Sequence, residues 1–349
     1  MQSYLVNSVF FLLLTCSLVC RADLLNYEQQ RIPLQPPLGP NELAVIINEA
    51  DPLSATLGAY YVAKRKIPRK NVIRVHFPSG KSVMSRETFD RVKREVEEAT
   101  PYQVQAYALT WVAPFRVDCM SITTAFAMGF DPAFCATGCQ PTRANPYFNS
   151  HSHRPWFDFG IRPTMSIAAS NLRRGIELIR RGVDADYTYP TGTAYLVSTT
   201  DRNRDVRSKL YPDAVKHIRP LFNIKVLRTN ALKKRDDVFF YFTGQTWVEG
   251  LETLTFLPGA IADHLTSAGG ILTGSRQMSA LRWLESGATG SYGTVVEPCN
   301  FLQKFPHPQV VMQHYLNGDT LIEAYWKSVA WPGQGIFIGE PLAKPFSLF

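Results

Sequence analysis

Apolar runs and amphipathic stretches alternate along most of the chain. Three runs of strand length, rich in β-branched residues, enclose two stretches with apolar residues at helical spacing, and a proline follows each of these stretches. The strands are predicted at 43–47, 71–77 and 104–112, and the helices at 51–67 and 85–100. A β-α-β-α-β order builds right-handed crossovers, a mainly parallel sheet and helices on both faces. We therefore predict an α/β fold with caspase-like or flavodoxin-like layering.

The pattern is lost between residues 114 and 165. This segment has no sustained period, carries three cysteines and two histidines, and is rich in aromatic residues and proline. Loops of this length in a compact domain are usually functional or form a cap. We expect a Cys- and aromatic-rich insertion, lying over one end of the sheet and held by its cysteines and aromatic contacts.

The alternation resumes after residue 165 and continues to the end, so that 41–349 is predicted to be a single α/β domain. The stretch AIADHLTS (260–267) has no clean period; we interpret the segment 256–270 around it as helical, and a segment that is part strand is the alternative. The strands are predicted at 193–198, 223–227, 237–243, 288–296 and 335–339. The helices are predicted at 167–181, 211–221, 256–270, 277–286 and 310–329, the last with a break at 317–319.

The N-terminus carries an apolar run, VFFLLLTCSLVC, which is too short to span a bilayer and has the length of a signal-peptide core. A cut after Ala22 would leave small residues at the positions that signal peptidases favour. We predict a signal peptide at 1–22 and an extended lead-in at 23–40; an uncleaved anchor is the alternative. The mature chain should be exported, periplasmic or extracellular, with no stable membrane span.

Composition narrows the function classes. The 349 residues are 45% hydrophobic and 12% aromatic, which is typical of a globular protein, and the formal net charge is +8. The basic residues are dispersed rather than gathered in a stripe between aromatic side chains, so nucleic acid is not an expected partner. Loose attraction to anionic polymers or lipid fits such a surface.

Six cysteines are present, and the leader holds Cys16 and Cys20, so four remain after cleavage. An even number in an exported chain permits two disulfides. Cys119, Cys135 and Cys139 are the disulfide candidates, with a metal site or free thiols as the alternatives. We expect no metal, because a zinc site would need more soft ligands at a fixed spacing, and no cofactor, because no glycine cluster has the spacing of a phosphate-binding loop.

The candidate chemistry lies late in the chain. A thiol becomes a nucleophile beside an imidazole, so Cys299 and His264 are a candidate catalytic pair, with Glu297 and Asp263 as candidate acid and base. Each has a structural alternative: a disulfide or buried role for the cysteine, and turn or cap roles for the carboxylates. The candidate substrate-binding residues follow predicted strands, where open α/β sheets bind ligands, and are Gln245, Ser267 and Glu340.

Long motifs give the chain a family resemblance. Five long motifs resemble those of an uncharacterised family of exported bacterial proteins. They are CMSITTAFAMGFDP (119–132), PGAIADHLTS (258–267), MSALRWLESGATGSYGTVVEPCN (278–300), KFPHP (304–308) and the stretch from GDTLIEAYW to EPLAKPF (318–346). That family occurs in species with the exosortase sorting system. The resemblance implies export and an association with envelope or exopolysaccharide components, and it implies no activity.

A more distant similarity is to the gingipain-like cysteine peptidases, whose core is caspase-like. The segments concerned are the GA strand from Gly287, the stretch GDTLIEA (318–324) and the final strand before Gly339-Glu340-Pro341. In those peptidases a His-Gly pair follows the third core strand and the nucleophilic cysteine precedes the GA strand. This chain has Gln245 and Ser267 near those positions.

Two functions follow. The first is a non-catalytic envelope- or polysaccharide-associated protein on a peptidase-like scaffold. The second is a cysteine hydrolase using Cys299 with His264. Both assume that the candidate polar residues late in the chain lie together at one edge of the sheet, where the strands end.

Overall fold

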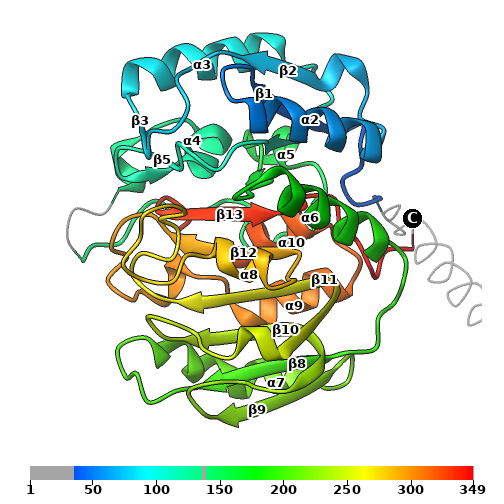
Figure 1. The fold of residues 1–349 in the computed structure, drawn as a ribbon, viewed down its shortest axis with the longest axis vertical. Coiled ribbons are helices and arrows are strands. Elements are labelled where there is room, and N and C mark those ends of the chain that lie inside the picture. The colour runs from blue at the N-terminus through cyan, green and yellow to red at the C-terminus, as the bar shows by residue number, and fades with distance from the viewer. Residues whose placement is uncertain (1–34, 136–138, 349) are drawn as a thin grey trace, which may run out of the picture. The chain divides into compact units, whose positions relative to one another are not determined.

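Within the described residues, ten strands form one mostly parallel sheet with helices on both faces (Figure 1). The computed structural model describes residues 35–135 and 139–348. The chain divides into Met1–Pro36 and Pro37–Phe349, and the fold is that of the second unit. The predicted signal peptide, 1–22, and most of the predicted lead-in, 23–40, lie outside the described residues. The predicted α/β fold with a mainly parallel sheet is confirmed.

The strand order is β2-β1-β4-β7-β13-β12-β11-β10-β8-β9, and a separate small sheet has the order β3-β5-β6. The strands of the main sheet are β1 (Leu43–Asn48), β2 (Val72–Val75), β4 (Ala106–Leu109), β7 (Thr164–Ser166), β8 (Thr193–Ser198), β9 (Asn223–Arg228), β10 (Arg235–Gly244), β11 (Leu254–Leu265), β12 (Gly290–Thr294) and β13 (Gly335–Gly339). Those of the small sheet are β3 (Val83–Met84), β5 (Arg116–Val117) and β6 (Met120–Ser121).

The main sheet consists of two parallel halves that run in opposite directions. β2, β1, β4, β7 and β13 run one way, and β12, β11, β10, β8 and β9 run the other. The halves meet where β12 pairs antiparallel with β13, with Gly290 opposite Gly339 and Thr294 opposite Gly335. In chain order, β8 to β12 have the 2-1-3-4-5 arrangement of flavodoxin-like sheets. The carboxyl ends of the two halves therefore lie at opposite edges of the sheet.

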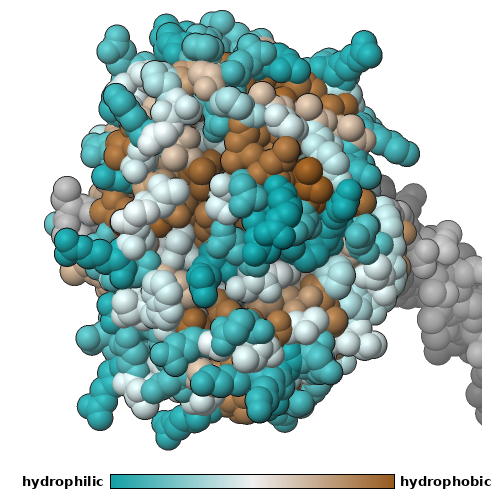
Figure 2. Space-filling model, in the orientation of Figure 1, coloured by the Kyte–Doolittle hydropathy of each residue, from teal (hydrophilic) through white to brown (hydrophobic). Residues whose placement is uncertain are grey.

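Helices cover both faces (Figure 1). On one face α2, α6 and α8 pack over β1, β11 and β12, and on the other α3, α4, α7, α9 and α10 pack over the remaining strands. The outer side of α6, rich in arginine, is hydrophilic in Figure 2. The α-helices are α2 (Pro52–Arg65), α3 (Arg86–Ala99), α4 (Ile122–Met128), α5 (Pro155–Phe159), α6 (Leu172–Ala185), α7 (Tyr211–Ile218), α8 (Leu281–Glu285), α9 (Pro308–Leu316) and α10 (Leu321–Ser328). The 3₁₀ turns are η1 (Arg69–Asn71), η2 (Pro132–Phe134), η3 (Asp205–Leu210), η4 (Leu251–Thr253) and η5 (Leu302–Lys304).

Local sequence explains where the main helices begin. Asp51 accepts a hydrogen bond from the Leu53 amide at the start of α2, and Ser85 accepts one from the Thr88 amide at the start of α3. The break predicted at 317–319 is present between α9 and α10, where Thr320 and Glu323 form a capping box. None of the described helices has both the length and the apolar character of a membrane span.

The predicted helix at 256–270 is wrong, and the alternative, a segment that is part strand, is correct. The segment is β11, at Leu254–Leu265, and residues 260–265 are all buried. β11 lies between β10 and β12 with helices on both faces, so both sets of alternating side chains are apolar or enclosed. A strand of this kind has no polar alternation, and its pattern cannot be distinguished from that of a buried helix.

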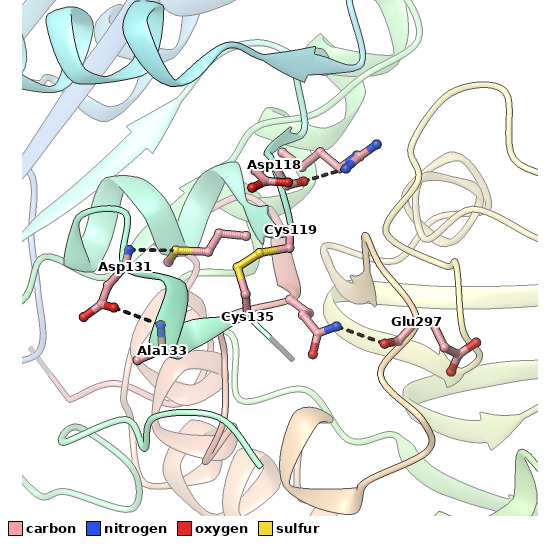
Figure 3. Close-up of a disulfide and its surroundings, with 9 residues drawn as sticks. Asp118, Cys119, Asp131, Ala133, Cys135 and Glu297 are labelled. Carbon is pink, nitrogen blue, oxygen red and sulfur yellow. Dashed lines mark hydrogen bonds between the residues drawn. A yellow bond between two sulfur atoms is a disulfide. The ribbon is translucent and has the colours of Figure 1, made fainter. Parts of the chain in front are cut away.

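The insertion at 114–165 enters the core more deeply than expected. Its helix α4 packs against β4, β7 and β13, and β7 itself lies between β4 and β13. Two disulfides hold the segment: Cys119–Cys135 within it, and Cys139–Cys299 to the loop after β12. Figure 3 shows the first bridge beside Asp131, whose carboxylate accepts a hydrogen bond from the Ala133 amide. The predicted disulfide candidates are thus confirmed as disulfides, and Cys299 joins them.

Candidate functional site

A cleft opens where β11 and β12 end. It has a volume of about 400 Å³ and is lined by Arg204, Thr266, Ser267, Glu297 and Cys299, among others. β8, β10, β11 and β12 are parallel, so the segments that follow them meet at one edge. Ligands of open α/β sheets bind at this kind of edge. We call this hollow the β11–β12 cleft.

The floor of the cleft is the turn after β11. The Thr266 hydroxyl donates a hydrogen bond to Gln277 Oε1 at 2.8 Å, and the Ala268 amide donates to the same oxygen at 2.8 Å. Thr294 Oγ1, on β12, lies 3.1 Å from the carbonyl oxygens of Thr266 and Ser267. These bonds fix the backbone around Ser267, whose hydroxyl has no hydrogen-bond partner among the described residues.

The loop after β8 forms a second wall and covers the end of β10. Arg204 donates from Nε to Thr266 Oγ1 at 3.1 Å and pairs through Nη1 with Asp201 at 3.0 Å. A side chain at Gly244, the last residue of β10, would place its Cβ 2.0 Å from the Arg204 carbonyl oxygen. Glycine at this position therefore allows the loop to cross the strand end, and the crevice between β8 and β10 is filled by the chain itself.

The third wall is the loop after β12. The Glu297 carboxylate accepts a hydrogen bond from the Cys299 amide at 2.8 Å, and the Glu297 carbonyl oxygen accepts one from Gln334 (Figure 3). Cys299 and Asn300 both have positive φ, at 55° and 48°. Glu297 thus holds a tight turn, and the disulfide between Cys299 and Cys139 attaches this turn to the insertion.

The structure does not support the candidate pair of Cys299 and His264. The sulfur of Cys299 is bonded to Cys139, and an oxidised sulfur is not a nucleophile. His264 is 1% exposed; its Nδ1 accepts a hydrogen bond from Trp283 at 2.9 Å, and its Nε2 donates to the Met278 carbonyl at 3.1 Å. Burial, together with the charges of Arg207 and Arg204, lowers the pKa of His264 to about 3. An imidazole so enclosed cannot take a proton from a thiol.

Asp263 points to the opposite face of β11 from His264, because successive side chains of a strand alternate. It is fully buried and forms an ion pair with Arg207 from η3. Arg207 also donates to the carbonyl oxygens of Thr243, at 2.9 Å, and of Asp263 itself, at 3.2 Å. Burial raises the pKa of Asp263 and by itself would lower that of Arg207, and in each case the charge of the partner opposes the effect of burial. Asp263 therefore ties η3 to the sheet and cannot reach a ligand in the cleft.

The remaining predicted site residues do not share one rim. Gln245 directly follows β10, at the same edge of the sheet as the β11–β12 cleft, but does not line the cleft. Glu340 follows β13 at the opposite edge, where it is fully buried and pairs with Arg65 at 2.6 Å. The expectation that the late polar residues gather at one rim is wrong for Glu340, because β13 runs antiparallel to β12.

Sequence reasoning missed the loop after β8. Its residues TTDRNRD follow a correctly predicted strand and supply Arg204 and Asn203 to the cleft. The rule that ligands bind at the carboxyl ends of strands would have found them if it had been applied to this strand.

The cleft is suited to binding by charge and hydrogen bonds. Within the described residues, no hydrogen bond joins a hydroxyl or thiol of its lining to an imidazole or a carboxylate, and no group of three His, Cys, Asp or Glu side chains could hold a metal ion. We compared the chain with protein-family models, curated proteins and solved structures, and found no match in any of them.

Proposed function

We propose that this chain is an exported, non-catalytic binding protein on a peptidase-like scaffold, with its ligand site in the β11–β12 cleft. The observation that carries the proposal is the Cys139–Cys299 disulfide in the wall of that cleft. It joins the two cysteines that line the cleft, so Cys299, the nucleophile that the sequence suggests, has no free thiol. The enclosed His264 removes the base.

The distant similarity to gingipain-like peptidases supports the same conclusion. In the register of that similarity β10 is the third core strand and β11 is the strand before the GA strand. The residues that follow these strands are Gln245 and Ser267, instead of a histidine and a cysteine. An amide cannot act as a general base, so a hydroxyl at Ser267 would stay protonated. The layered scaffold and its cleft would be kept while the catalytic pair is lost.

Export is proposed from two features. The predicted signal peptide at 1–22 would direct the chain out of the cytoplasm, and both disulfides would persist only in an oxidising compartment. A link to envelope or exopolysaccharide components is proposed from the family resemblance alone.

Matched cysteine variants test the absence of catalysis. Cys139→Ser frees the Cys299 thiol, whereas Cys299→Ser removes it, and each breaks the same disulfide. Hydrolysis of a mixed peptide library and of an ester substrate is measured at neutral pH for both variants and for the wild type. We expect no turnover above background in any of the three. Turnover by Cys139→Ser that Cys299→Ser lacks would establish the cysteine hydrolase instead.

A further inference from the structure

A second hollow lies at the same edge of the sheet, on the other side of the loop after β8. It has a volume of about 590 Å³, which is within the usual range of small-molecule sites. Its walls come from the carboxyl ends of β8 and β9 and from η3. We call it the β8–β9 pocket, and it is lined by Thr199, Arg202, Asp205, Ser208, Lys209 and Arg228, among others.

Three cationic side chains face this pocket without a protein partner. Arg202, Lys209 and Arg228 are exposed, and in the part of the chain that the structure describes none of them forms an ion pair or a side-chain hydrogen bond. They come from three different segments: the loop after β8, η3 and the end of β9. Their convergence on one hollow creates a local positive potential.

The single carboxylate that lines the pocket does not neutralise these cations. Asp205 accepts hydrogen bonds from Ser198 Oγ at 2.7 Å, from Ser208 Oγ at 2.9 Å and from the Thr199 amide at 2.8 Å. Its two oxygens are therefore occupied in holding the loop. With three cations and one carboxylate, the lining keeps a net positive charge.

The loop that carries Arg202 is held in place before any ligand arrives. Thr199 donates to the Gly244 carbonyl oxygen at 2.8 Å, which ties the loop to β10. The Thr200 amide donates to Asn230 Oδ1 at 2.9 Å, and the Asn230 amide donates back to Thr200 Oγ1 at 2.9 Å, which joins the loops after β8 and β9. A framework ordered in advance reduces the entropy lost on binding.

The arginines of α6 show the contrast. Arg173 and Arg174 pair with Glu177 at 3.6 and 3.2 Å, and Arg181 donates to two main-chain oxygens. The guanidinium groups of these three α6 arginines therefore have partners within the protein. The three cations of the β8–β9 pocket have none among the described residues.

We propose that the β8–β9 pocket binds a ligand through an oxyanion: a carboxylate, a phosphate or a sulfate. Guanidinium groups bind all three through paired hydrogen bonds, and Arg202 and Arg228 supply them from two different segments of the wall. The proposal stands on the pocket's own residues, so it does not depend on the β11–β12 cleft or on the absence of catalysis.

Calorimetric titration of the full chain with its disulfides intact tests this. The probes are oligogalacturonate, inorganic phosphate and sulfate, with a neutral maltooligosaccharide as the reference. At least one anion should bind and the neutral sugar should not, and the anion that binds identifies the source of the charge. Added salt should weaken the binding. Arg202→Gln and Arg228→Gln should each reduce the affinity about tenfold, as expected for loss of a charge-assisted hydrogen bond.

The matched control is Arg173→Gln, which removes the same charge from α6 and should leave the affinity unchanged. The inference is wrong if no anion binds more tightly than the neutral sugar, or if Arg173→Gln weakens binding as much as Arg228→Gln. Turnover that depends on Cys299 would overturn the proposed function while leaving these affinities as they are.

Discussion

At the residue scale, Lys304 is the side chain whose environment most opposes its charge. It is fully buried after β12, and its Nζ has no hydrogen-bond partner among the described residues. The ring of Phe301 lies 5.3 Å from Nζ. Burial lowers the pKa of Lys304 to about 8, although the charge of Glu297 opposes the shift. The protonated form is therefore destabilised by folding.

Replacing Lys304 by methionine should stabilise the protein. At pH 7 the wild type folds with a protonated amine in a buried position, so Lys304→Met should raise the free energy of unfolding by about 1 to 3 kcal/mol. The folded pKa lies below the unfolded one, so the stability of the wild type rises with pH from about 8 to about 10.5. The difference in the free energy of unfolding between Lys304→Met and the wild type should therefore decrease over that pH range. Urea titrations at several pH values measure it.

Lys216, exposed on α7, gives the control variant Lys216→Met, for which we expect no comparable gain. A loss of stability in Lys304→Met, or a gain that does not change with pH, would show that the amine has a partner that the structure does not reveal.

Local chemistry sets the starts of α2 and α3, which match the helices predicted at 51–67 and 85–100. Asp51 and Ser85 cap helices because their side chains reach amides two or three residues ahead. The partners of Cys299 and His264 could not be predicted in this way. Cys139 is 160 residues away from Cys299 in the sequence, and no pattern around His264 indicates that Trp283 encloses it.

At the scale of elements, the insertion is attached to α10 through an ionisable cluster. His153 Nδ1 lies 2.6 Å from Glu323 Oε1, and its Nε2 lies 3.8 Å from Asp319 Oδ1. Lys327 and His314 also contact Asp319, at 2.7 and 3.0 Å. Burial alone would lower the pKa of His153, but the hydrogen bond and the charge of Glu323 raise it above its ordinary value of 6.5.

This cluster predicts a pH-dependent stability. A raised folded pKa means that the stabilisation is fully present below about pH 6.5 and is lost as the pH rises through the folded pKa. His153→Asn should therefore cost more stability at pH 5.5 than at pH 8.5. Thermal unfolding of the two proteins across this range measures the difference. His76→Asn, at an exposed histidine, is the control. A cost for His153→Asn that is equal at both pH values would contradict this account.

An element with a one-sided pattern was predicted closely: in α3 only Phe89, Val92 and Val96 are buried, and the predicted helix at 85–100 matches it. β11 was not, because neighbouring strands and helices on both faces bury it. The helix α4, in the insertion, was not predicted either. All but its last residue are buried, so it has no polar face that would reveal a helical period.

At the scale of the whole molecule, the long-range disulfide should contribute more to stability than the short one. Cys139–Cys299 spans 160 residues and Cys119–Cys135 spans 16. Loop-closure entropy predicts about 5 kcal/mol for the first and about 3 kcal/mol for the second. The double variants Cys139→Ser/Cys299→Ser and Cys119→Ser/Cys135→Ser serve as controls for each other in guanidinium titrations. A larger loss from the shorter bridge would contradict the prediction.

The reversal between the two half-sheets was beyond the reach of sequence patterns. Each half is predicted by its own alternation of strands and helices, but nothing in GIFIG states that β13 pairs antiparallel with β12 and parallel with β7. That choice places Glu340 at the edge opposite to Glu297. The fold class was therefore predictable, and the grouping of the site residues was not.

The state of Cys299 in the folded protein tests the central claim most directly. The native chain is treated with iodoacetamide at neutral pH, digested without reductant and mapped by mass spectrometry. We expect one linked peptide that contains Cys139 and Cys299, and no label on Cys299. A Cys299 that is labelled rapidly in the folded chain would contradict this account, because it would show a free and reactive thiol in the β11–β12 cleft.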